Sequence, residues 1–241
     1  MTIPAIHIDN VQKAFGQQTV LRDIALDVGH GELFGLIGLN GMGKTTLIKA
    51  MLDLLRADAG TIELFGISSH EHKARAQLAY VPEKCSPHGN LRGHEYISLS
   101  LAAYGHRVTR AQMEEAAVLF DLDPAALSKM VRQYSKGMGQ KITLMAAFMT
   151  PAKLLVLDEP MSGLDPRARS AVKKQMHRAK TEGRTVFFSS HILADMQEIC
   201  DRITVMHDGT LIYTGDSERF RAQYGNGSLE DVFLNAIGQA A

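Results

Sequence analysis

The chain reads Gly38-Leu39-Asn40-Gly41-Met42-Gly43-Lys44-Thr45 at the point that decides its fold, and this stretch fits the pattern G-x-x-x-x-G-K-[ST] of a phosphate-binding loop. Its glycines let the backbone curl and direct several N–H groups at one anion. The apolar run over residues 33–37 predicts a buried strand before the loop, and residues 46–52 predict a helix after it. A helix N-terminus adds N–H donors and a favourable dipole. This strand–loop–helix order indicates a nucleoside triphosphate site rather than a chance glycine-rich turn.

Each polar residue of the loop has an expected role. Lys44 is expected to reach the β- and γ-phosphates, and the Thr45 hydroxyl is expected to ligate Mg²⁺. The residues expected to contact the nucleotide here are Gly38, Asn40, Gly41, Gly43, Lys44, Thr45 and Thr46.

A second acidic motif follows far along the chain. Residues 154–157, Leu-Leu-Val-Leu, form a short apolar run typical of a parallel strand buried on both faces. Asp158 stands at its carboxyl end, the edge at which open α/β sheets bind ligands, so we expect it to hold Mg²⁺ directly or through water. Glu159 is expected to orient or activate the attacking water. Either carboxylate alone would be unremarkable at a strand end, and both gain meaning from the phosphate loop upstream.

Composition limits the partners that the chain can have. Of its 241 residues 45% are apolar, as in a globular protein, and 26 Lys and Arg balance 26 Asp and Glu. Zero net charge does not favour binding to nucleic acid. The longest run without a charged residue is 11 residues, below the roughly 18 of a spanning helix. No signal peptide is recognised, and Cys85 and Cys200 are isolated, so the simplest setting is the cytosol.

The order of patterns along the chain predicts the fold class. Residues 5–38 read as strands, and the alternation over 24–28 is typical of an antiparallel strand. Further strands are expected at 61–65 and 185–188, a helix at 166–181 and a hairpin over 203–215 that turns at Asp208-Gly209. Residues 88–150 carry helical patterns instead. We therefore predict an α/β fold: a P-loop NTPase core with a mixed sheet, N-terminal antiparallel strands and an inserted α-helical subdomain.

Further motifs, in their order along the chain, give a family resemblance. Tyr80-Val81-Pro82-Glu83 leads into the helical region, and Tyr134-Ser135-Lys136-Gly137-Met138 precedes a predicted helix. Ser162-Gly163-Leu164-Asp165 follows the second acidic motif, and Ser189-Ser190-His191 ends a later strand. Over nearly its whole length the sequence resembles the nucleotide-binding subunit of ABC transporters. The resemblance implies one ABC ATPase domain over residues 1–241, with a RecA-like core at about 1–87 and 151–241 and a helical subdomain at about 88–150.

The resemblance also implies roles and partners. Phe15 stands where the family stacks an aromatic ring on adenine, although a core phenylalanine is the alternative. His191 is expected to stabilise the γ-phosphate, so Glu159, His191 and Lys44 form the catalytic set. Ser135 and Gly137 of one subunit are expected to face the ATP held by another, with Asp165 communicating across the dimer. Two ATP molecules with Mg²⁺ would then be sandwiched between two copies, or between this chain and a paralogue.

Two departures from the family pattern point to a subgroup. The family commonly has Gln where this chain has Glu83, which would then contact Mg²⁺-bound water through a carboxylate. The signature segment, residues 134–138, commonly reads Leu-Ser-Gly-Gly-Gln, and Lys136 and Met138 replace its third and fifth residues. Both departures, and the tail over residues 228–234, resemble a subgroup whose members mostly serve exporters.

The resulting expectation is an ATPase subunit that powers export by a separate membrane permease, bound at the inner face of the cell membrane. The alternatives are the ATPase subunit of an importer and a soluble ABC ATPase without a transport role. A GTPase is disfavoured because the chain has no Asn-Lys-x-Asp motif. The transported cargo is not encoded in these motifs, because its path belongs to the permease.

Overall fold

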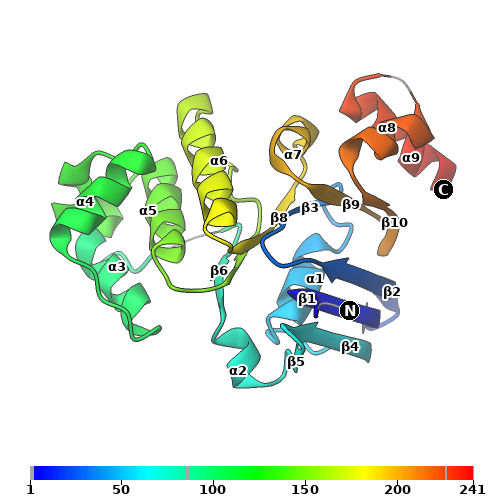
Figure 1. Ribbon diagram of the computed structural model, residues 1–241, viewed down its shortest axis with the longest axis horizontal. Helices are drawn as coiled ribbons and strands as arrows, with labels where there is room; N and C mark the ends of the chain where they lie inside the picture. The colour runs from blue at the N-terminus through cyan, green and yellow to red at the C-terminus, as the bar shows by residue number, and fades with distance from the viewer. Residues whose placement is uncertain (1–2, 85–86, 226, 241) are drawn as a thin grey trace.

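The computed structural model describes residues 3–84, 87–225 and 227–240, and Cys85 lies outside this part. Two sheets organise the chain (Figure 1). The larger has the order β10-β9-β3-β8-β7-β6, with bounds β3 Leu33–Ile37, β6 Leu78–Val81, β7 Leu154–Leu157, β8 Thr185–Ser190, β9 Arg202–His207 and β10 Thr210–Gly215. Its neighbours pair in parallel except β9 and β10. The smaller sheet is antiparallel, in the order β2-β1-β4-β5, with β1 Ile6–Phe15, β2 Gln18–Val28, β4 Ala59–Leu64 and β5 Ile67–Ser68.

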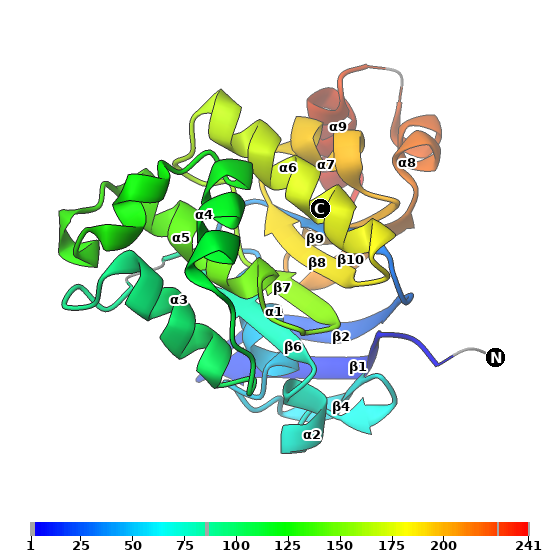
Figure 2. The same cartoon turned by 60° about the vertical axis from the view of Figure 1, so that its left-hand side comes forward.

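The helices fall into groups around the larger sheet. The region between β6 and β7 contains α3 Gly93–Ala102, α4 Arg110–Leu119, the 3-10 turns Pro124–Ser128 and Val131–Gln133, and α5 Lys136–Phe148. These helices lie together at one end of the molecule (Figure 2). The remaining helices are α1 Lys44–Met51, α2 His72–Arg75, α6 Pro166–Thr181, α7 Leu193–Ile199, α8 Ser217–Tyr224 and α9 Leu229–Ala240. In the described part of the chain, no helix has the length and apolarity needed to span a membrane.

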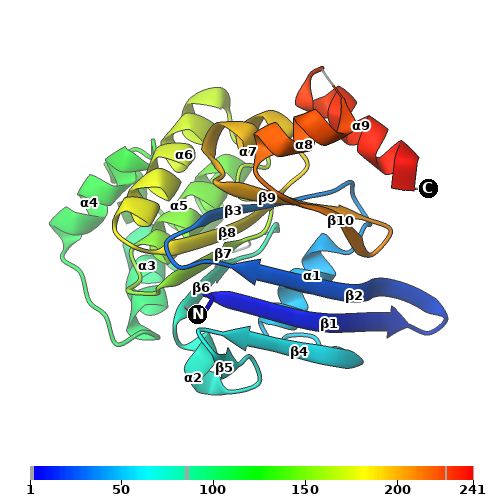
Figure 3. The ribbon, with the colours of Figure 1, turned by 45° about the vertical axis from the view of Figure 1, so that its right-hand side comes forward.

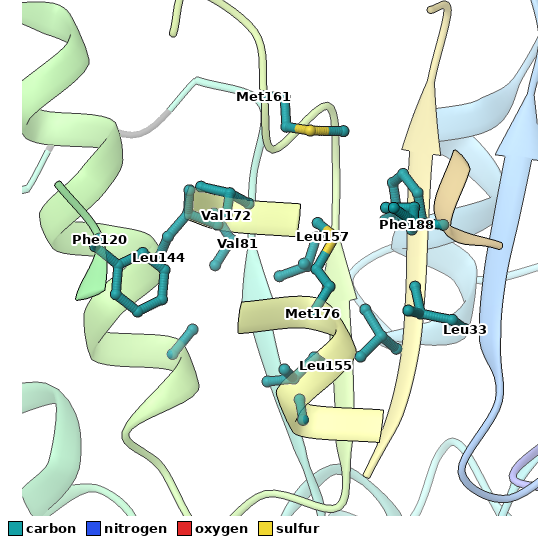
Figure 4. Packing of buried hydrophobic residues seen from close by; sticks show 14 of the residues in the cluster. Leu33, Val81, Phe120, Leu144, Leu155, Leu157, Met161, Val172, Met176 and Phe188 are labelled. Atoms are coloured by element: carbon teal, nitrogen blue, oxygen red, sulfur yellow. The ribbon is translucent and has the colours of Figure 1, made fainter. Parts of the chain in front are cut away.

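The core forms two clusters, one on each face of the larger sheet. Along β3, Leu33 and Ile37 join the cluster that packs against α5 and α6. Figure 4 shows part of this cluster, including Leu33, Leu155 and Phe188. Phe34 and Leu36 point the other way, toward α1 and the antiparallel sheet. Alternating side chains therefore fill both clusters, and this double burial explains why β3 and β7 are apolar rather than amphipathic.

The predicted fold class is confirmed, with local differences. The hairpin of β9 and β10 turns at Asp208 and Gly209, both with positive φ, as a two-residue turn of this kind requires. The strand expected at 61–65 begins two residues earlier and ends one residue earlier, at Leu64, because Phe65 and Gly66 adopt φ of 55° and 74° and turn the chain from β4 into β5. Figure 3 shows the antiparallel sheet lying below the larger one, with the C-terminal helices beside β10.

Candidate functional site

The phosphate loop connects β3 to α1 at the carboxyl edge of the larger sheet. Gly43 precedes the helix with φ 105°, and a Cβ there would lie 2.9 Å from the Val20 carbonyl oxygen. A Cβ on Gly38 would lie 2.8 Å from the carbonyl oxygen of Met206. Both positions therefore need glycine, because the loop passes close to neighbouring backbone.

Lys44 is held inside the loop that it follows. Its side chain is 6% exposed, and its ammonium group donates to the carbonyl oxygens of Gly38 at 2.7 Å and Leu39 at 3.2 Å. It also lies 3.5 Å from Oε1 of Glu159. The charge is thus buried close to one carboxylate and directed into the loop, as a phosphate-binding lysine requires.

Asp158 follows β7 and is almost fully buried. Its Oδ2 accepts a 2.8 Å hydrogen bond from the Thr45 hydroxyl, and its Oδ1 accepts a 2.6 Å hydrogen bond from the Ser189 hydroxyl. A carboxylate and a hydroxyl within hydrogen-bond distance are hard oxygen donors of the kind that Mg²⁺ prefers, usually together with waters and substrate phosphates. The pair therefore fits Mg²⁺, with Thr45 and Asp158 as the residues that would hold it.

Glu159 is constrained on several sides. Its backbone adopts φ 48°, which is unusual for this residue type, and its N–H donates to the Ser189 hydroxyl at 2.9 Å. Its Oε2 lies 2.9 Å from Nδ1 of His191. Its Oε1 is buried and accepts no hydrogen bond. A buried carboxylate oxygen gains from a hydrogen-bond donor, and the Lys44 ammonium group, 3.5 Å away, is an ion-pair partner beyond hydrogen-bond distance, so this atom can accept a hydrogen bond from a ligand or water.

Lys44, Thr45 and Glu159 open into one cavity of about 250 Å³, whose lining does not include Asp158 or His191. The structure brings most of the predicted nucleotide-binding residues together around it; the lining consists of Val20, Leu39, Asn40, Gly41, Gly43, Lys44, Thr45, Thr46, Glu83 and Glu159. Phe15 is not part of this lining. Its ring is half exposed at the end of β1, with the Lys13 ammonium group 5.4 Å from its centre. With this exposure Phe15 is not a core residue.

The other predicted residues lie outside the cavity. Ser135 is the N-cap of α5, and its hydroxyl accepts a hydrogen bond from the Met138 N–H at 3.2 Å. Gly137 lies in the first turn of the same helix. Asp165 caps α6 by accepting the Ala168 N–H at 3.0 Å, and this backbone hydrogen bond lowers the pKa of its carboxyl group. The single chain therefore separates the phosphate cavity from the signature segment.

Comparison with known protein families identifies the chain. A family model described as ABC transporter matches residues 21–162, which contain both the phosphate loop and the signature segment. The chain belongs to the ABC transporter family. It is an ATP-binding protein of this family, and ATPase activity accompanies that membership.

Individual relatives and a solved structure agree with this assignment. The daunorubicin resistance ATP-binding protein DrrA3 of Streptomyces coeruleorubidus is 34% identical over 99% of this ABC protein and 76% of its own length. The Nod factor export ATP-binding protein I of Burkholderia orbicola is 32% identical over 89% of this chain and 72% of its own. A structure described as the ATP binding subunit of an ABC transporter superposes with a TM-score of 0.87 at 31% identity, covering 96% of this chain and 99% of that one. Two other relatives are longer, and the chain spans 56% and 59% of their lengths.

The structure of this ABC protein adds residues whose roles the motifs did not assign. Ser189 connects Asp158 and Glu159 through one hydroxyl. The parallel register that pairs Leu157 with Phe188 places it there, so only knowledge of the strand order would have identified it. Gln140, on α5, donates to the Pro160 carbonyl oxygen at 3.1 Å and links the signature helix to the segment after Glu159.

Proposed function

We propose that this chain powers export by a separate membrane permease, through Mg²⁺-dependent ATP hydrolysis in a dimer that encloses two nucleotides. The export direction is supported by relatives named for drug resistance and for Nod factor export. The helices of residues 88–150 would form a subdomain that, together with the Glu83 loop, contacts the permease at the inner face of the membrane. Leu99, 62% exposed on α3, gives this region an apolar contact for a partner.

The buried Oε1 of Glu159, which accepts no hydrogen bond and lies 3.5 Å from the Lys44 ammonium group, is the observation that carries the chemistry. A water placed there would donate a proton to this carboxylate as its oxygen attacks the γ-phosphorus. The bond from the γ-phosphorus to the bridging oxygen then breaks, and ADP and phosphate leave. Lys44 would stabilise the phosphate charge, and His191, held beside Glu159, would orient the carboxylate and face the γ-phosphate.

The metal would act beside these groups. Thr45 would hold Mg²⁺, Asp158 would hold it directly or through water, and Glu83 would contact a bound water. When bound, Mg²⁺ neutralises part of the charge on the β- and γ-phosphates. Ser189 donates a hydrogen bond to Asp158 and so fixes the orientation of the carboxylate on the metal side of the site.

The nucleotide would complete its contacts only in a dimer. Phe15 would stack on the adenine, and Ser135 and Gly137 of a second copy would meet the γ-phosphate at the N-terminus of α5. Two identical copies give two equivalent composite sites, so a homodimer is the simplest assembly. Asp165, which follows Ser162-Gly163-Leu164 and caps α6, would contact the partner.

The substitution Glu159→Gln tests the proposal. It removes the proton acceptor but keeps the shape of the side chain, so ATP should bind and stay unhydrolysed. Size-exclusion chromatography with light scattering should show a monomer without nucleotide and a dimer with MgATP. Glu182→Gln, at an exposed glutamate paired with Arg178, is the matched control and should retain turnover. Wild-type turnover in Glu159→Gln would refute the assignment of the base.

A further inference from the structure

The turn that follows α4 brings one acidic side chain between two helices. Asp121 has φ 53°, a left-handed backbone conformation that Asp and Asn tolerate better than most residues. Its Oδ2 lies 2.9 Å from the Lys141 ammonium group on α5, and its Oδ1 lies 2.7 Å from Nε of Arg167 on α6. One carboxylate therefore contacts both the signature helix and the helix that Asp165 caps.

The two contacts are unequal. Lys141 is 11% exposed and also donates to the backbone carbonyl oxygen of Asp121 at 2.6 Å, so its position does not depend on the carboxylate alone. Arg167 is 86% exposed, and among the described residues its recorded ion pair is with this carboxylate. Loss of the charge at Asp121 would therefore release α6 from the turn while α5 stays attached.

Two other contacts join α5 to the segment after Glu159 directly, without a third element between them. Gln140 donates to the Pro160 carbonyl oxygen, and the Lys136 side chain lies against Gly163, where a Cβ would be 3.4 Å from its Cε. The contact through Asp121 differs because a third element, the end of α4, fixes the first turn of α6. Arg167 is two residues beyond Asp165, so this contact lies next to the residue that is proposed to contact the partner subunit.

We infer that Asp121 is a positioning residue that sets Asp165 and the N-terminus of α5 in one fixed arrangement for the composite nucleotide site. The inference rests on the proposed ATP-bound dimer. A carboxylate that holds two cations from two helices restricts their relative movement without touching the nucleotide. Its removal should weaken closure of the dimer and leave nucleotide binding to one chain unchanged.

The test uses Asp121→Asn in the full chain, and also in the Glu159→Gln background. Asparagine accepts the left-handed conformation and leaves the backbone carbonyl for Lys141, so the fold should be kept. We expect the dimer dissociation constant with MgATP to rise, and kcat to fall, each about three- to tenfold. Binding of a fluorescent ATP analogue to dilute monomer should not change.

A matched control is available at Asp53, which has φ 55° and accepts hydrogen bonds from His70 at 2.7 Å and Arg75 at 3.0 Å, away from α5 and α6. Asp53→Asn should leave the dimer dissociation constant and kcat unchanged. Arg167→Gln should reproduce the loss seen with Asp121→Asn, and the double variant should lose no more than either single variant. Because Arg167 is exposed, this second variant also serves if Asp121→Asn fails to fold.

The outcomes for these variants distinguish failure of the proposed dimer from failure of the positioning role of Asp121. If Glu159→Gln remains monomeric with MgATP, the sandwich dimer is refuted and the inference falls with it. If Glu159→Gln dimerises and neither Asp121→Asn nor Arg167→Gln weakens the dimer, the proposed function stands and the positioning role is overturned. Equal losses in Asp121→Asn and Asp53→Asn would also overturn it, because the effect would then be general.

Discussion

The two segments expected to bind phosphate, the P-loop and the signature segment, differ in how many of their polar groups are held by contacts within the chain. At the P-loop and the strand end beside it, Lys44 and Asp158 are buried and hydrogen-bonded to groups of the same chain. At the signature segment, Ser135 is exposed and its helix N-terminus has no acidic residue in the first turn. One half of the site is preorganised inside a single chain, whereas the other consists of an exposed helix end. Damage to the first should therefore appear in the monomer, and damage to the second only in the dimer.

The largest effect is expected at Lys44. Lys44→Met keeps the length of the side chain and removes its charge, so hydrolysis should fall by about 10³-fold or more and ATP affinity should also fall. ATPase assays and a nucleotide titration of dilute monomer would measure both. Lys49→Met, on the exposed face of the same helix, is the control and should behave as wild type. Normal ATP affinity in Lys44→Met would contradict the idea that this half works alone.

A glycine-to-alanine substitution can be made both in the P-loop and in the signature segment, and the two variants should differ. Gly43→Ala adds a Cβ where φ is 105° and the Val20 carbonyl oxygen is 2.9 Å away, so the loop should lose about 1–3 kcal/mol and bind ATP poorly even as a monomer. Gly137→Ala meets nothing nearer than 3.8 Å. Its unfolding free energy should be unchanged or higher, because alanine favours a helix.

Only ATP-dependent dimerisation and kcat should suffer in Gly137→Ala, by about 10-fold or more, since the added methyl group would face the partner's phosphate. Thermal unfolding, monomer titration and light scattering with MgATP distinguish the two variants. If Gly137→Ala weakens ATP binding by the monomer, the separation between the halves is incorrect.

The smallest effect concerns Asp165. Its folded pKa lies below the ordinary 3.8, chiefly because the Ala168 N–H donates to the carboxylate. A lowered folded pKa adds stability that is present above the unfolded pKa and lost as pH falls through the folded value. Asp165→Asn retains a good cap, so its melting temperature should be close to wild type at neutral pH. The remaining difference should shrink at about pH 4 and below, and a difference independent of pH would contradict this.

Local patterns predicted the P-loop half of the site better than its connections. The strand before the loop and the strand before Asp158 are short runs buried on both faces, and the loop between strand and helix is a contiguous motif, so neighbouring residues carried the information. The link from Ser189 to both carboxylates depends on the pairing of β7 with β8. The contact of Asp121 with two helices depends on tertiary packing. Neither arrangement has a periodicity or spacing that a single sequence displays.

Ser189, at the end of β8, is hydrogen-bonded to both Asp158 and Glu159, which follow β7. ATP hydrolysis therefore depends on the correct register between β7 and β8. A slip of β8 by one residue against β7 would bring Phe188 or Ser190 opposite Asp158 and turn the neighbouring side chain to the other face of the sheet. Such a misaligned chain would retain its glycine-rich loop but lose the support of both carboxylates. A misaligned pairing of β7 and β8 would thus produce subunits that bind ATP without hydrolysing it, rather than subunits with uncontrolled hydrolysis.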